Sequence, residues 1–255
     1  MATLFNLQGH KALVTGGGRG IGQAMAIGLA EAGADIVLIL RTPSQTETKE
    51  EIERLGRKCW VHHYDLAVKE DVSALVPDVL AAHPDVDILL NAAGIQRRFR
   101  AEEYSDATFE EVMQVNVSSA FSLCRDIGQH WIANNVQGRI INTASLASFQ
   151  GGVRMAGYAV SKGGIAMLTK ALSNEWAGYG IRVNAIAPGY IATDMNADTR
   201  SDSNSDYYKS ITQRIPMGRW GDPRDFKGPA VFLASDASSY MTGEIIMVDG
   251  GWMAR

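Results

Sequence analysis

Tyr158 and Lys162 stand four residues apart in the segment YAVSKGGIAMLTKAL, which has a helical pattern. Residues at this spacing lie on one face of a helix, so the phenol and the ammonium can act together. A free tyrosine has a pKa of about 10, and acid or base work near neutral pH needs the phenolate stabilised by roughly 4 kcal/mol. A positive charge ~4 Å away supplies about that energy. The pair therefore predicts proton transfer, and Ser145, which ends the run GRIINTAS, offers a hydroxyl that can hydrogen-bond the reacting oxygen.

The segment GGGRGIG at 16–22 joins the apolar run KALVT to the helical stretch QAMAIGLAEAGA. In this context Gly16 permits a tight turn, Gly20 lets the backbone approach a pyrophosphate, and Gly22 allows close packing of the helix on the strand. The free N–H groups and the helix dipole then point at an anion. The turn predicts a dinucleotide-binding site.

The end of the second apolar run reads ILRT, without the Asp or Glu that would bind the ribose hydroxyls of NAD. Arg41 stands there instead, and Arg19 lies in the glycine-rich turn. Two guanidinium groups can pair with a 2′-phosphate through charge-assisted hydrogen bonds. The sequence favours NADP as the cofactor, with NAD as the alternative.

Short apolar runs alternate with longer helical patterns along the whole chain, which predicts an α/β fold. The runs are continuously apolar, as is typical of a parallel sheet covered by helices on both faces. They predict a doubly wound seven-stranded sheet whose strands are His10–Thr15, Asp35–Leu40, Lys58–Tyr64, Val86–Asn91, Gly138–Ala144, Arg182–Ala187 and Glu244–Val248.

No Pro- or Ser-rich linker divides the chain, so we expect a single dinucleotide-binding catalytic domain over residues 1–255. The stretch 196–205 is the exception, because Asp, Ser, Asn and Thr crowd together there without an apolar period. Such a segment cannot bury enough area to hold itself rigid. It predicts a mobile substrate loop at about 190–215.

The composition excludes several classes of protein. A formal net charge of −4 and the lack of a long Lys/Arg run argue against nucleic-acid binding. Cys59 and Cys124 are too few for a disulfide-stapled or cysteine-rich metal protein, and we expect both to be core thiols. The five histidines form no ligand pattern, so no catalytic metal is expected. The chain has neither a signal-peptide pattern nor a membrane-length apolar run, which predicts a cytoplasmic enzyme.

A series of short motifs resembles the short-chain dehydrogenase/reductase family, and the resemblance covers essentially the whole chain. The motifs occur in the family's order: TGGGRGIG at 15–22, NAAG at 91–94, Asn116, Ser145, YAVSK at 158–162 and PG at 188–189. The resemblance implies a Rossmann-type sheet with the strand order 3-2-1-4-5-6-7. It also implies a homo-oligomer, commonly a tetramer, for which the helical stretches 106–134 and 157–178 could supply an interface.

The resemblance also implies roles for the residues of these motifs. Tyr158 would give a proton to a ketone or take one from an alcohol while hydride moves to or from nicotinamide, and Ser145 would steady the oxyanion. Lys162 would hold the nicotinamide ribose, and Asn116 would support a water that leads protons to Lys162, although an Asn could instead satisfy backbone groups where a helix bends. With Asp65 as an adenine contact, the predicted cofactor residues are Gly16, Arg19, Gly20, Ile21, Gly22, Arg41, Asp65, Leu66, Asn91, Ala92, Gly94, Tyr158, Lys162, Pro188, Gly189, Ile191 and Thr193.

Within the family, the stretches SFQGGVR, RIPMGRWGDP and VDGGWMAR resemble sugar-acid enzymes of the 2-dehydro-3-deoxy-D-gluconate 5-dehydrogenase and gluconate 5-dehydrogenase type. A sugar acid needs a cation for its carboxylate, and Arg97, Arg98 and Arg154 are candidates, with Gln150 also shaping the pocket. We therefore expect an oxidoreductase acting on a keto-deoxy sugar acid or polyol. The alternatives are a 3-oxoacyl or general carbonyl reductase and a non-catalytic cofactor-binding protein.

Overall fold

A computed structural model describes residues 4–202 and 205–255. Its strands form one seven-stranded parallel sheet in the order 3-2-1-4-5-6-7, which confirms the topology that the family resemblance implied. The strands are β1 (Lys11–Thr15), β2 (Asp35–Leu40), β3 (Cys59–His63), β4 (Ile88–Asn91), β5 (Arg139–Thr143), β6 (Arg182–Pro188) and β7 (Ile245–Val248).

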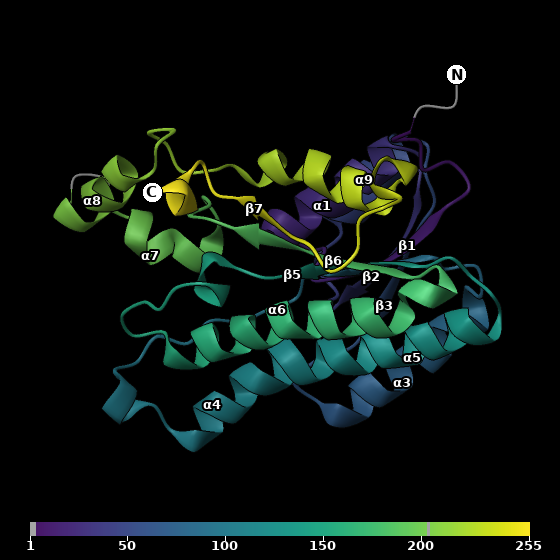
Figure 1. The fold of residues 1–255 in the computed structure, drawn as a ribbon, viewed down its shortest axis with the longest axis horizontal. Helices are drawn as coiled ribbons and strands as arrows, with labels where there is room; N and C mark the ends of the chain where they lie inside the picture. The colour runs from purple at the N-terminus through teal and green to yellow at the C-terminus, as the bar shows by residue number, and fades with distance from the viewer. Residues whose placement is uncertain (1–3, 203–204) are drawn as a thin grey trace.

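Helices cover both faces of the sheet (Figure 1). One face is covered by α1 (Gly20–Glu31), α2 (Glu47–Arg54) and α9 (Lys227–Ala234), and the other by α3 (Lys69–Ala82), α4 (Asp106–Met113), α5 (Ser119–Ala133) and α6 (Ala156–Trp176). Each face buries its own apolar core, because successive side chains of a strand point to opposite sides. In β2, for example, Leu38 packs in the α1 core while Val37 packs in the α3 and α5 core.

The register of the sheet brings the carboxyl ends of the central strands together. Thr15 of β1 pairs with Asn91 of β4, and Asn91 pairs with Asn142 of β5. The loops that follow these strands therefore leave from the same edge of the sheet, where ligands bind in open α/β folds. The segments 16–22, 92–98 and 144–154 are positioned in this way.

The segment predicted as a substrate loop contains helices. Asp194–Asn196 forms a 3₁₀ turn, followed by α7 (Ala197–Arg200) and α8 (Asp206–Arg214), while residues 203 and 204 lie outside the described residues. The Ser205 hydroxyl caps α8 by accepting a hydrogen bond from the Tyr208 N–H at 3.2 Å, and Ile211 is buried in an apolar cluster. The mobility of this segment stays a prediction.

Both cysteines lie in the apolar core as free thiols, as predicted. Burial raises the pKa of each to about 12, so neither is a reactive thiolate near neutral pH. None of the described helices is long and apolar enough to span a bilayer.

Candidate active site

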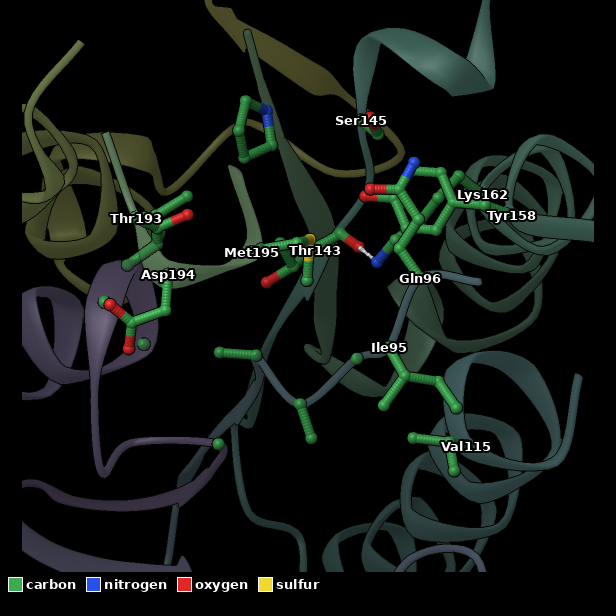
Figure 2. A pocket seen from close by; sticks show the side chains of 18 of the residues that line it. Ile95, Gln96, Val115, Thr143, Ser145, Tyr158, Lys162, Thr193, Asp194 and Met195 are labelled. Carbon is green, nitrogen blue, oxygen red and sulfur yellow. Dashed lines mark hydrogen bonds between the residues drawn. The ribbon is translucent and has the colours of Figure 1, made fainter. Parts of the chain in front are cut away.

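A cavity of about 430 Å³ opens at the carboxyl edge of the sheet. Its volume falls in the usual range for small-molecule sites, roughly 300–1,000 Å³. Every residue predicted to bind the cofactor lines this cavity except Asn91. Figure 2 shows Ser145, Tyr158 and Lys162 on one side of it and Thr193 and Asp194 across from them.

The glycine-rich turn forms one wall of the cavity, and it leaves no room for a side chain at Gly16 or Gly22. Gly16 has a φ of +69°, and a Cβ there would lie 2.6 Å from the Cα of Ala93. A Cβ on Gly22 would collide with the carbonyl oxygen of Gly16, which explains the close packing of α1 on β1. At the N-terminus of α1, Arg19 makes no side-chain cap and the first turn holds no acidic residue. These free N–H groups fit a pyrophosphate.

Arg41, Asp65 and Leu66 line one end of the cavity, and their contact with the adenosine of a cofactor stays a prediction. Arg19 lies beside the same cavity, and its Nη1 is 3.3 Å from the Oδ2 of Asp194. Both side chains of this ion pair are largely exposed, so water weakens their attraction. A bound phosphate can therefore draw Arg19 away from Asp194 at little cost.

The catalytic candidates converge at the other end. Lys162 is 4% exposed, and its Nζ donates to the Thr143 carbonyl at 2.6 Å, the bond drawn as a dashed line in Figure 2. The same Nζ lies 5.7 Å from the centre of the Tyr158 ring. The Ser145 hydroxyl accepts the Ala147 N–H at 3.1 Å, and Ser145 lies close enough to Tyr158 to lower the pKa of its phenol. Ser145, from the loop after β5, and Tyr158 and Lys162 of α6 thus share one pocket wall.

The pKa values of this group correct one part of the electrostatic prediction. Burial raises the pKa of Tyr158, although the Ser145 hydrogen bond and the Arg98 charge pull it down. Lys162 does not supply the expected lowering, because its ammonium is directed to Thr143 and burial lowers its own pKa to about 8. The raised pKa keeps the Tyr158 hydroxyl protonated near neutral pH when no cofactor is bound.

Asn116 lies behind the cavity in a π-helical turn, Gln114–Ser118. Its Oδ1 accepts the Ile95 N–H at 2.8 Å, and its Nδ2 donates to the Ile95 carbonyl at 2.9 Å and to the Ser161 hydroxyl at 3.0 Å. Asn116 thus satisfies backbone groups where the helix is distorted, which is one of the two roles that the sequence analysis considered for it. Its role in a water relay to Lys162 stays a prediction.

Asn91 does not line the cavity, which corrects its predicted place at the cofactor. Its Nδ2 donates to Asn142 at 2.9 Å and to the Cys124 sulfur at 3.3 Å, and the side chain is buried. A polar side chain in an apolar core is stable only when it is hydrogen-bonded. Asn91 therefore ties β4 to β5 and acts on the site only through the sheet.

The structure separates the three arginines proposed for a substrate carboxylate. Arg97 does not line the cavity, and it pairs through Nε at 3.0 Å and Nη2 at 2.6 Å with Glu111, which does line it. Arg154, at a φ of +62°, lies outside the cavity lining. Both placements are corrected. Arg98 lines the cavity, and its only partners among the described residues are Gln96 and Asn196, each at 3.5 Å.

Gln150 lines the cavity as predicted, and the sequence reasoning missed several neighbours. Thr143 presents the carbonyl that holds Lys162, and its position two residues before Ser145 could have indicated it. The sequence did not indicate that Asp194 and Asn196 line the cavity, because the residues around them show no regular spacing of apolar side chains. Nowhere in residues 4–202 and 205–255 do three or more His, Cys, Asp or Glu side chains gather to hold a metal ion.

This fold and this site define an oxidoreductase of the Rossmann type, and comparison with known proteins places it. A family model described as enoyl-(acyl carrier protein) reductase matches residues 16–253. The chain belongs to the short-chain dehydrogenase/reductase family, which confirms the resemblance.

The chain is similar to the 2-dehydro-3-deoxy-D-gluconate 5-dehydrogenase of Pseudoalteromonas atlantica, with 49% identity over 257 residues and all of both chains covered. A structure from Beutenbergia cavernae, assigned as an NAD(P)-dependent gluconate 5-dehydrogenase and holding NADP at low occupancy, is 45% identical with a TM-score of 0.95, covering 99% of this chain and 100% of that one. A gluconate 5-dehydrogenase from Burkholderia cenocepacia, in complex with NADP and tartrate, is 37% identical with a TM-score of 0.92 over 98% of each chain.

Proposed function

We propose that the chain is an NADP-dependent oxidoreductase that interconverts a ketone and a secondary alcohol in a keto-deoxy sugar acid. The observation that supports this most directly is the meeting of Ser145, Tyr158 and Lys162 in the cavity that the glycine-rich turn also lines. The nicotinamide, when bound, supplies or accepts the hydride. The names of the relatives support the substrate class.

The residues of the site supply the proton and the stabilisation of charge. In reduction the Tyr158 hydroxyl gives its proton to the ketone oxygen, and its raised pKa keeps that proton in place until the oxygen becomes basic. The Ser145 hydroxyl hydrogen-bonds the same oxygen as negative charge develops on it. The Lys162 ammonium keeps positive charge at the site and can hold a ribose hydroxyl of the cofactor.

Arg98 is the cation that we assign to the substrate carboxylate. It lines the cavity, it has no carboxylate partner within the described residues, and its charge reaches Tyr158. Replacing Arg98 by Ala is expected to raise KM for a sugar acid about 10- to 100-fold, the value of one or two charge-assisted hydrogen bonds. Steady-state kinetics on Arg98→Ala measure this.

The matched control is Arg100→Ala, an arginine two positions along the chain that pairs with Glu102 outside the cavity lining. It is expected to leave KM within about threefold of the wild type, because exposed ion pairs contribute little. Equal KM increases in the two variants, or none in Arg98→Ala, would remove Arg98 from the substrate site.

For the cofactor, Arg19 and Arg41 are the cations beside the cavity that can receive a 2′-phosphate. The NADP bound in the two related structures supports this choice. In the double variant Arg19→Ala/Arg41→Ala, Kd for NADPH is expected to rise about 100-fold while Kd for NADH changes less than threefold, since NADH lacks the phosphate. Fluorescence titration of both cofactors measures the two constants, and equal losses would contradict the assignment.

The test of the proposed function is a substrate screen with purified protein and NADPH. The panel contains keto-deoxy sugar acids, ketogluconates, neutral ketoses and 3-oxoacyl thioesters. We expect the sugar acids to have the highest kcat/KM. Preference for the 3-oxoacyl thioesters would favour the acyl-reductase alternative, and no turnover with intact NADPH binding would favour a non-catalytic cofactor-binding protein.

Three further predictions remain part of the proposal. The single domain is supported by one sheet that takes strands from residue 11 to residue 248. The tetramer is supported by exposed apolar side chains on the two long helices, namely Phe121 on α5 and Val160 and Met167 on α6. A cytoplasmic location fits the two free thiols.

A further inference from the structure

The segment 249–255 packs against the cavity wall, because its Trp252 contacts the lining residues Gln150 and Tyr190. The Asp249 carboxylate accepts the N–H groups of Gly251 and Met253, both at 2.8 Å, and so fixes a tight turn. Trp252 on this turn is 4% exposed and belongs to an apolar cluster that includes Leu146, the residue after Ser145. A side chain far along the sequence is thus held beside the catalytic serine.

Trp252 contacts three parts of the site. Its Nε1–H donates to the Oε1 of Gln150 at 3.3 Å. Its ring lies 4.7 Å from the ring of Tyr190, which lines the cavity, and the Arg214 guanidinium of α8 lies 4.0 Å from the ring centre. Arg255 also donates to the last carbonyls of α8, those of Gln213 and Arg214. Segment 249–255 therefore links α8 to the pocket wall.

The bond between Trp252 and Gln150 determines which end of the amide faces the ligand. An indole N–H is a donor only, so it takes the oxygen of the Gln150 amide. The Nε2 group then points the other way, and no acceptor in the described residues receives a hydrogen bond from it. Gln150 lines the cavity, so its amide can reach a ligand there.

We infer that Trp252 is a positioning residue that locks Gln150 with its amide N–H donors toward the substrate, where they bind an acceptor such as a carboxylate or hydroxyl oxygen. The sugar-acid identity of that ligand rests on the proposed function, whereas the coupling between Trp252 and Gln150 does not. Trp252 sets the affinity for substrate without touching it.

A double-mutant cycle tests the coupling. Trp252→Phe keeps a ring against Tyr190 and Arg214 but removes the N–H, and Gln150→Ala removes the amide. We expect Trp252→Phe to raise KM about fivefold with kcat and Kd for NADPH within about twofold, and to have no further effect on KM in the Gln150→Ala background. Trp60→Phe, on the edge strand β3, is the control and leaves KM unchanged. Melting temperatures confirm that each variant folds.

Gln150→Glu tests the direction of the amide. A carboxylate can still accept from Trp252, but it offers the ligand a negative oxygen where the amide offers a donor. KM for a sugar acid is expected to rise at least about tenfold and KM for a neutral ketone much less. An unchanged KM in Gln150→Glu would overturn the inference, as would a Trp252→Phe effect of equal size in both backgrounds.

The proposed function and this inference fail in different ways. If the enzyme reduces only neutral ketones, the sugar-acid proposal is wrong, and the double-mutant cycle with the accepted ketone still decides the coupling. If sugar acids are reduced and the two substitutions have independent effects on KM, the inference is wrong while the proposed function stands.

Discussion

Replacing Tyr158 by Phe is expected to lower kcat about 10³-fold, within the 10²- to 10⁴-fold range that a positioned general acid contributes. The substitution removes one oxygen from a side chain that lines the cavity beside Ser145. Nothing else on the pocket wall has to move, because the ring keeps its volume. Single-turnover kinetics, followed by the loss of NADPH absorbance, measure the chemical step directly.

Binding of the cofactor provides the control for Tyr158→Phe. The Kd for NADPH is expected to stay within about threefold of the wild-type value, because the glycine-rich turn and the arginines are untouched. A variant that turns over at the wild-type rate would show that the proton comes from another group. A variant that loses NADPH binding as well as turnover would show that Tyr158 acts in holding the cofactor.

Replacing Lys162 by Met is expected to lower kcat/KM about 10²- to 10³-fold, because it removes the buried charge of the site while nearly preserving the volume. The loss should appear both in Kd for NADPH and in kcat, since the same ammonium is assigned to the cofactor ribose and to the positive charge of the site. Fluorescence titration and initial rates separate the two contributions. A loss confined to one of them would contradict the double role.

The pKa of Lys162, lowered to about 8 by burial, adds a pH dependence. The ammonium is present below this pKa and is lost as the pH rises through it, so kcat/KM for ketone reduction is expected to fall above about pH 8. Tyr158 does not cause this fall, because burial raises its pKa above the ordinary value of 10. Lys162→Arg, which stays charged, should shift the fall to higher pH, and an unshifted profile would assign it to another group.

The fold followed from the sequence because its strands are short, apolar and covered on both faces. The run Asp35–Leu40 is β2 with the bounds that the pattern predicted, and the other runs differ by one or two residues at their ends. Periodicity could not supply the strand order, which came from the family resemblance. It also missed α7 and α8, because these helices present mostly polar side chains and bury little beyond Ile211.

The residues predicted to bind the cofactor line the cavity, apart from Asn91, whereas Arg97 and Arg154, predicted for the substrate, do not line it. Close backbone contacts in the turn permit only glycine, as at Gly16, so the sequence itself shows where these contacts occur. Arg97 and Arg98 are neighbours of the same type, and the sequence gives no sign that Arg97 pairs with Glu111, fourteen positions along the chain. Asn91 was predicted beside the cofactor, but its side chain is hydrogen-bonded to Asn142 on the neighbouring strand. Such a partner, far along the chain, cannot be recognised from the sequence pattern.

The central claim is that hydride and proton reach a sugar-acid ketone in the cavity that holds Tyr158 and the glycine-rich turn. NADPH deuterated at the transferable C4 position, incubated with a keto-deoxy sugar acid and purified protein, tests it most directly. We predict an alcohol product with one deuterium on the former carbonyl carbon, formed about 10³-fold more slowly by Tyr158→Phe. Product without deuterium at that carbon, or formed equally fast by the variant, would contradict the account.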